Sequence, residues 1–221
     1  DPEGDAAFAK AAAEAGNVVV ASRAEVYTRV VEENGSFVEN PFYVESFEYP
    51  YDALRAVTTY GFSNTAPDSD DVVRHAILSL EHNGERMYSF SYQTYLKYME
   101  FLGKEPYVPP VDGMNLYGIR YIAQPDNYNR ASWVDVVSGE RDLSGFKDSV
   151  VLIGAYTAGM MDQYFVPISS KGQMYGVEIH ANIVDSLCRG FSYVAANSTF
   201  LRLVIVVLCA LFFLVLWKTN L

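Results

Sequence analysis

The chain has 221 residues, half of them apolar and 14% aromatic, which is enough for one sizeable domain with its own core. Its formal net charge of −11 should repel nucleic acid and anionic lipid, so we expect no nucleic-acid partner. Two cysteines, Cys188 and Cys209, are too few for a disulfide framework or a zinc cluster.

The first predicted elements are a helix and a strand. Residues 5–16 are rich in alanine, with Asp5 as an N-cap and Gly16 as a stop, and they predict a helix. Residues 17–22, NVVVAS, contain an apolar run that predicts a short buried strand directly after it. A helix, a glycine and a strand make up the second half of a parallel β–α–β unit. We therefore expect the chain to be part of a longer protein that supplies the first strand.

The middle of the chain mixes several patterns. Residues 23–50 hold strand-forming aromatics that Pro41 and Pro50 interrupt, and we interpret them as an irregular or edge segment. The patterns that follow predict a helix over 52–60, a polar loop over 64–71, a strand from 72, a turn at Asn83–Gly84, a helix over 88–102 and a strand over 114–124.

Two further patterns complete the fold class. Residues 132–140 predict a helix of one to two turns with Ser132 as its cap. Residues 148–156 contain a continuous apolar run, which is typical of a strand buried on both faces of a parallel sheet. The alternation of helices and strands predicts an α/β fold, with a mixed, mostly parallel sheet and flanking helices.

The stretch GVEIHANIVDSLCRG, residues 176–190, predicts an amphipathic helix. Apolar residues recur at helical spacing on one side: Val177, Ile179, Ile183, Val184 and Leu187. Four polar residues recur at steps of four, three and four and share the opposite side, which we expect to be exposed: Glu178, Asn182, Asp185 and Arg189. His180 lies on the apolar side or at its border, where we expect it to be buried and hydrogen-bonded to a neighbouring loop.

Residue types suited to chemistry gather around this helix. Asp162 follows the predicted strand over 148–156, and ligands of open α/β sheets bind beyond the carboxyl ends of strands. Alternatively, Asp162 caps a turn, or pairs with His180 or a backbone amide. Our candidate ligand-binding residues are Asp162, Glu178, His180 and Asn182.

The patterns of known catalytic sites are not met. Glu178 and His180 are two residues apart and point in different directions, whereas a zinc-binding helix places two histidines four apart. The GAYTAG stretch at 154–159 lacks the lysine of a phosphate-binding loop. We therefore predict no catalytic residue, metal or cofactor in this segment. The alternative hypothesis is a membrane-anchored, metal-dependent hydrolase with a site around Asp162, Glu178 and His180.

The C-terminal segment predicts a membrane anchor. Residues 199–217 carry one charge, at Arg202, and are long enough to cross a hydrocarbon core. Arg202 and Lys218 can reach the headgroups at the two ends, and Trp217 suits the membrane interface. We expect residues 199–217 to form a transmembrane helix, followed by a truncated stub over 218–221.

Three blocks of the sequence, taken in order, resemble the CHASE2 domain, the extracytoplasmic sensor module of many bacterial receptors. The first block is GF with PDSDDVVR, within residues 61–74. The second is IRYIAQP with ASWVDVVSG, within 119–139. The third and most specific is VLIGAYTAGMMDQYFVPI with GVEIHANIVDSL, within 151–187. The resemblance covers about residues 1–190.

The resemblance implies a membrane receptor. Residues 1–198 would be a ligand-sensing domain outside the plasma membrane, lacking some N-terminal sequence, and helix 176–190 would pass a conformational signal to the membrane helix. The implied output domain is cytoplasmic, an adenylate or guanylate cyclase or, second, a kinase. The receptor would act as a homodimer on an unknown small-molecule or protein ligand. The sequence departs from the family at Asp71, where glycine is common, and over 24–50, which matches no part of the pattern.

Overall fold

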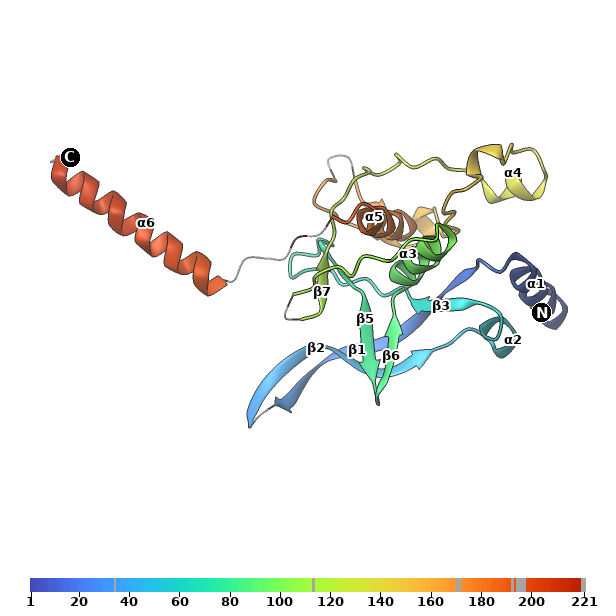
Figure 1. The fold of residues 1–221 in the computed structure, drawn as a ribbon, viewed down its shortest axis with the longest axis horizontal. Coiled ribbons are helices and arrows are strands. Elements are labelled where there is room, and N and C mark those ends of the chain that lie inside the picture. The colour runs from blue at the N-terminus through green and yellow to red at the C-terminus, as the bar shows by residue number, and fades with distance from the viewer. Residues whose placement is uncertain (34, 113, 170–171, 192, 194–197, 220–221) are drawn as a thin grey trace.

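The computed structural model describes residues 1–33, 35–112, 114–169, 172–191, 193 and 198–219, and it confirms a mixed α/β fold (Figure 1). Its helices are α1 (Pro2–Ala15), α2 (Asp52–Arg55), α3 (Phe90–Phe101), α4 (Trp133–Val137), α5 (Gly176–Cys188) and α6 (Ser198–Thr219). Its strands are β1 (Val19–Glu33), β2 (Ser36–Glu48), β3 (Thr59–Phe62), β4 (His75–Ile77), β5 (Ser79–His82), β6 (Glu85–Tyr88), β7 (Leu116–Gly118), β8 (Gln163–Tyr164) and β9 (Met174–Tyr175).

Within these described ranges, the strands form one three-stranded sheet and three two-stranded sheets. The larger sheet has the order β2–β1–β3, with β1 antiparallel to β2 and parallel to β3. The pairs β4–β7, β5–β6 and β8–β9 are antiparallel. The mixed pairing is confirmed, but the described sheets are mostly antiparallel where mostly parallel pairing was predicted. The parallel β1–β3 ladder is short and runs from Val19 and Thr59 to Ser22 and Phe62. Hairpin turns between consecutive strands, as in β1–β2 and β5–β6, produce antiparallel pairs.

Helix α1 confirms the predicted N-terminal helix but begins earlier. The side chain of Asp1 accepts a hydrogen bond from the N–H of Glu3 (3.2 Å), so Asp1 rather than Asp5 is the N-cap. Pro2 suits the first turn because its missing N–H would have no helical partner there. Gly16 ends the helix in the left-handed conformation, with φ 68°.

Strands β1 and β2 form a long hairpin, where the sequence predicted a short strand over 17–22 and an irregular or edge segment over 23–50. In Figure 1 the outer part of this hairpin extends from the body as an arm. β2 is indeed an edge strand, and Pro41 lies where the register of the ladder shifts. Aromatic pairing supports the ladder, since the rings of Tyr27 and Tyr43 lie 5.2 Å apart. The prolines argued against regular strands in this segment, but an edge strand can accommodate a proline where its ladder is irregular.

Two predicted helices are shorter than expected. The helix predicted over 52–60 ends with α2, and its last residues belong to β3, because β-branched residues favour an extended backbone there. The helix predicted over 88–102 begins later, as α3, after its N-cap Ser89. The turn at Asn83 and Gly84 is confirmed. Both residues have positive φ (51° and 80°), as a two-residue turn between β5 and β6 requires.

The strand predicted over 148–156 is wrong. Residues 150–156 carry no regular structure, and Ile153 is 74% exposed. An apolar run forms a strand when a neighbouring strand supplies hydrogen-bond partners, and none of the described strands pairs with this one. The strand predicted over 114–124 is limited to β7, because side chains of α5 bind the backbone that follows it. Helix α4 confirms the short helix predicted over 132–140.

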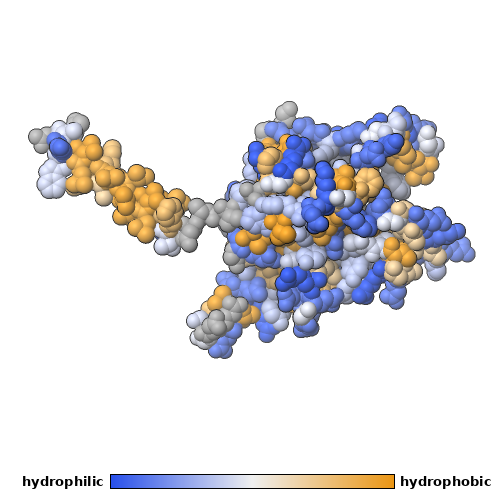
Figure 2. Space-filling view, viewed as in Figure 1, coloured by the Kyte–Doolittle hydropathy of each residue, from blue (hydrophilic) through white to orange (hydrophobic). Residues whose placement is uncertain are grey.

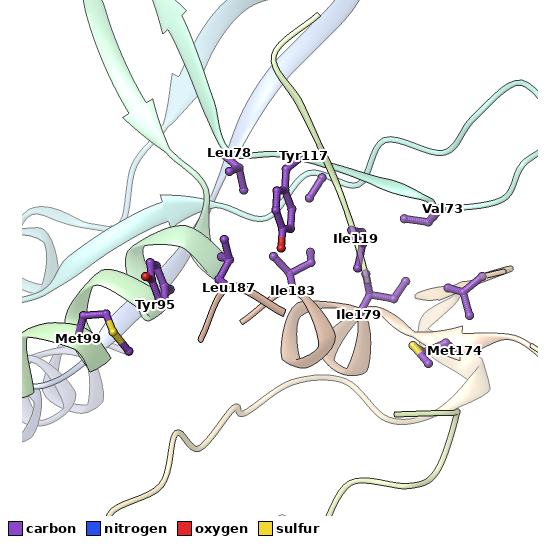
Figure 3. Packing of buried hydrophobic residues seen from close by; sticks show 12 residues of the cluster. Val73, Leu78, Tyr95, Met99, Tyr117, Ile119, Met174, Ile179, Ile183 and Leu187 are labelled. Carbon is purple, nitrogen blue, oxygen red and sulfur yellow. The ribbon is translucent and has the colours of Figure 1, made fainter. Parts of the chain in front are cut away.

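The main hydrophobic core lies where β4, β7, α3 and α5 meet (Figure 3). Tyr117 of β7 is fully buried, and its ring points toward α5 in this view. Helix α3 contributes Tyr95 and Met99. Helix α5 supplies three buried aliphatic side chains: Ile179, Ile183 and Leu187. Each such side chain contributes about 1.5–3 kcal/mol when it is fully buried, so this core holds α5 firmly against β7.

Helix α6 confirms the apolar helix predicted over 199–217. Its stretch from Thr199 to Thr219 is long and apolar enough to cross a membrane, and none of its most apolar window is buried in the rest of the chain. Figure 2 shows this apolar helix set apart from a body whose surface mixes polar and apolar residues. Trp217 is exposed near the helix end and packs edge-on against Phe213.

Candidate functional site

The polar side of α5 is buried, which contradicts the exposed face that its spacing predicted. Three polar residues at intervals of four have exposed fractions of 4%, 0% and 0%: Glu178, Asn182 and Ser186. The periodicity placed them correctly on one side of the helix, but the segment over 117–126 covers that side. Asp185 and Arg189, at the far end of the predicted face, form the expected ion pair (2.8 Å) near the surface.

Asn182 binds the backbone of the segment that covers it. Its Oδ1 accepts hydrogen bonds from the N–H groups of Ile122 (2.9 Å) and Ala123 (3.0 Å). Its Nδ2 donates to the carbonyl of Glu178 one turn earlier (3.0 Å). Buried N–H groups need acceptors, and the side-chain amide of Asn182 supplies the acceptor that a neighbouring strand would otherwise supply.

Glu178 performs a similar role at the start of the helix. Its Oε1 accepts a hydrogen bond from the N–H of Asp126 (2.8 Å), and its Oε2 from the N–H of Tyr175 (3.4 Å). A carboxylate in the first turn is also stabilised by the helix dipole. Both carboxylate oxygens therefore serve the local structure.

Ser186 connects α5 to the chain that leaves it. The hydroxyl groups of Ser186 and Tyr117 lie 2.6 Å apart, and the Tyr117 hydroxyl also donates to the carbonyl of Phe191. The guanidinium of Arg120 lies 3.8 Å from the centre of the Phe191 ring. The Tyr193 hydroxyl donates to a backbone carbonyl next to β4 (3.3 Å). The exit from α5 is thus held to β7 and β4, the strands of the core.

His180 faces α3, away from the other polar residues. Its Nδ1 lies 2.7 Å from the Ser91 hydroxyl, and the Phe90 ring packs edge-on against the imidazole (5.3 Å). Burial lowers the pKa of His180 to about 4, although a hydrogen bond with the backbone of Ser63 opposes this shift. The imidazole is therefore neutral at pH 7 and joins two packed helices.

Asp162 lies at the N-terminal end of α5. Its backbone carbonyl accepts a hydrogen bond from the N–H of Gly176 (3.1 Å). A Cβ on Gly176 would lie 2.5 Å from both carboxylate oxygens of Asp162, so the carboxylate packs against Gly176 and would have to move if this residue carried a side chain. The structure does not gather the four candidates at one point. Asp162 faces the start of α5, Glu178 and Asn182 face the covering segment, and His180 faces α3.

A cluster of charged and aromatic side chains near this helix end was missed by the sequence reasoning. Arg130 pairs with the carboxylate of Asp126 (2.8 Å) and lies 4.5 Å from the centre of the Tyr156 ring. The Tyr156 hydroxyl donates to Asp126, and burial together with this bond raises the pKa of Tyr156. The Tyr156 and Tyr175 rings lie 4.1 Å apart. Nearby, the Tyr128 hydroxyl is buried without a hydrogen-bond partner among the described residues. These residues come from separate segments of the chain, so no spacing in the sequence reveals them.

The convergence that a metal-dependent hydrolase would need is not found. In the part of the chain that the structure describes, no three His, Cys, Asp or Glu side chains gather as metal ligands would. Glu178 is bound to backbone N–H groups, and His180 contacts Ser91 and Phe90 instead of Asp162. The hydrolase hypothesis is therefore not supported.

The loop before β4 forms a second charged cluster. The Arg74 guanidinium donates two hydrogen bonds to Asp70 (2.7 and 2.9 Å) and one to Asp68 (2.9 Å), and these bonds lower the pKa of Asp70 to about 2. Asp68 also lies 2.9 Å from Nδ1 of His75. Asp71 has φ 61°, a conformation that glycine adopts without strain and aspartate tolerates. This backbone explains why glycine suits the position.

Two shallow hollows lie at the three-stranded sheet. One, of about 370 Å³, is bounded by β1 and the chain around α2, and the other, of about 200 Å³, lies between β3 and β6. Arg55 is close to them, with its guanidinium 4.1 Å from the centre of the Tyr49 ring. None of the four predicted ligand residues lines either hollow.

The comparisons with known proteins point to one family. The model of the CHASE2 domain matches residues 1–217, nearly the whole chain. No curated protein and no solved structure matches. The match includes the three blocks that carry the resemblance, the buried polar side of α5 and most of helix α6.

Proposed function

The chain belongs to the CHASE2 domain family, and from this premise we propose that residues 1–198 sense a ligand outside the cell for a receptor whose α6 crosses the plasma membrane. The family match supports an extracytoplasmic sensing role. The length and apolarity of α6, with none of its apolar window buried, support a membrane span. Arg202 at one end, and Trp217 and Lys218 at the other, would anchor it at the two interfaces. The observation that carries the proposal is the family match over residues 1–217.

The ligand is a small molecule or a protein that acts at the N-terminal end of α5. Among the four candidates, Asp162 is partly exposed and lies at this end of the helix, and the cluster of Asp126, Arg130 and Tyr156 lies against the same helix end. Glu178, Asn182 and His180 would support this site indirectly, because their hydrogen bonds hold α5 to its neighbours. No cofactor is part of this proposal.

The signal would travel along α5 to its exit. The bonds among Tyr117, Ser186 and Phe191 tie the end of α5 to β7, and α6 begins a few residues later at Ser198. A ligand that favours one of two arrangements of α5 would shift this exit and so the membrane helix.

The output is proposed to be cytoplasmic and enzymatic, an adenylate or guanylate cyclase in the first place and a kinase in the second. The support is the resemblance to bacterial receptors of this type. The receptor is proposed to act as a homodimer, since output domains of these classes work in pairs.

The proposal is tested in membranes that contain the full-length receptor. Cyclic-nucleotide formation and phosphate transfer are measured for the native protein, for Tyr117→Phe and for Tyr98→Phe. Tyr117→Phe removes the hydroxyl that ties α5 to its exit, and we expect output to change about fivefold or more. Tyr98→Phe, on the partly exposed side of α3, is the matched control and should leave output unchanged. Membranes with neither activity, or equal output from all three proteins, would contradict the proposal.

A further inference from the structure

Strand β1 has a free hydrogen-bonding edge along the arm. It pairs with β3 from Val19 to Ser22. The side chain of Asn64 then closes the edge at Ala24, accepting from its N–H (2.9 Å) and donating to its carbonyl (2.7 Å). Over residues 25–33, β1 pairs with β2 on one edge, and none of the described strands pairs with its other edge. An open edge of this length is a template for another strand.

The outward-facing backbone groups follow from alternation along β1. The carbonyl of Ser22 accepts a hydrogen bond from the N–H of Ser63 on the β3 side (3.0 Å), and the N–H and C=O groups of Ala24 point to the same side, where they bind the side chain of Asn64. Both register shifts in the hairpin skip a residue of β2, so β1 alternates without interruption. The N–H and C=O groups that point away from β2 therefore belong to Val26, Thr28, Val30 and Glu32.

The two edges of the arm differ in how they are protected. The outer edge of β2 contains Pro41, which has no N–H, and both bulges of the ladder. The edge of β1 has no proline and no bulge, and β-branched residues alternate along it. Apolar side chains of the arm also face solvent, with Val30 63% and Phe37 80% exposed. Since proteins usually protect free edges, the unprotected one indicates a pairing surface.

We propose that this edge pairs with the same edge of a second copy of the chain, antiparallel about a two-fold axis at Thr28. The register sets Val26 opposite Val30 of the second copy, and Tyr27 opposite Arg29 of the second copy. Both are favourable cross-strand pairs, one apolar and one cation–π. The surface is complementary to itself, as a two-fold interface requires.

Charge supports this register despite the acidity of the chain. Over residues 24–32 no two like charges stand directly opposite each other, because Glu25 faces Val31 and Glu32 faces Ala24. A two-fold axis one residue further on, at Arg29, would oppose two guanidinium groups and is disfavoured. The proposal names the surface for the homodimer and so rests on the receptor's acting as a pair.

Site-specific cross-linking of the full-length protein in membranes tests this surface. In a Cys188→Ser, Cys209→Ala background, Thr28→Cys places a thiol at the two-fold axis, where facing Cα atoms are about 5.5 Å apart. Glu39→Cys places a thiol at a position of β2 that is likewise exposed, and it is the matched control. With a short thiol-specific cross-linker, we expect at least about tenfold more covalent dimer from Thr28→Cys than from Glu39→Cys.

A second variant separates pairing from misfolding. Val30→Lys changes an exposed side chain, keeps the β1–β2 ladder and should reduce the cross-link at position 28 about tenfold. A receptor that is dimeric by light scattering but equally cross-linked from both strands would overturn the arm proposal and leave the paired receptor intact. A receptor that is monomeric throughout would overturn both.

Discussion

Replacing Asn182 with alanine tests the claim that the polar side of α5 is structural. The change removes the acceptor of two buried N–H groups, those of Ile122 and Ala123. Each N–H left without a partner costs about 1–3 kcal/mol, so we expect a loss of roughly 2–5 kcal/mol in the free energy of unfolding. This is a large share of the 5–15 kcal/mol that is typical of a domain, and the variant should be close to unfolding at 37 °C.

The assay is urea unfolding of the detergent-solubilised chain, followed by near-ultraviolet circular dichroism. Asp185→Ala on the same helix is the matched control, because its ion pair with Arg189 lies near the surface and is worth about 0–1 kcal/mol. If Asn182→Ala lowers the midpoint no more than Asp185→Ala does, Asn182 is not the clamp that we describe, and the exposed polar face predicted from spacing would be right.

Three further predictions follow from local geometry. Since the folded pKa of His180 is about 4 and its usual value is 6.5, the unfolded chain binds more protons between these pH values. Stability should therefore fall by up to roughly 3 kcal/mol from pH 7 to pH 4, and thermal melts of His180→Gln should lack this slope. Asp71→Gly should keep or raise the melting temperature, whereas Asp71→Val should cost about 1–2 kcal/mol because of the left-handed backbone, and equal melting temperatures would refute the strain. Gly176→Ala should lower the urea midpoint because its Cβ meets Asp162 at 2.5 Å, and Gly145→Ala, where nothing lies within 4 Å of the added Cβ, is the control.

Features with a local cause could be predicted from the sequence. The stop of α1 at Gly16, the turn at Asn83–Gly84 and the apolar helix α6 depend on residues next to each other, and all three are confirmed. The strand predicted over 148–156 depended on a partner elsewhere in the structure. Its apolar run carried no information about whether that partner exists.

The candidate site shows the same division. Helical spacing correctly grouped Glu178 with Asn182 on one side of α5, but it could not show that a loop some 60 residues away covers that side. Tyr156 lay at the end of the strand predicted over 148–156, and its partners Asp126 and Arg130 come from a separate loop. Tertiary contacts between loops leave no period in a sequence, so the cluster required the structure.

Labelling of intact cells with a membrane-impermeant thiol reagent tests most directly whether the body of the chain lies outside and α6 crosses the membrane. In the background without native cysteines, Phe37→Cys lies on the arm, 80% exposed, and Lys218→Cys lies at the far end of α6. We predict that the thiol at position 37 reacts in intact cells, and that the thiol at 218 reacts after the membrane is permeabilised. Reaction at 218 in intact cells, or at 37 only after permeabilisation, would contradict the account.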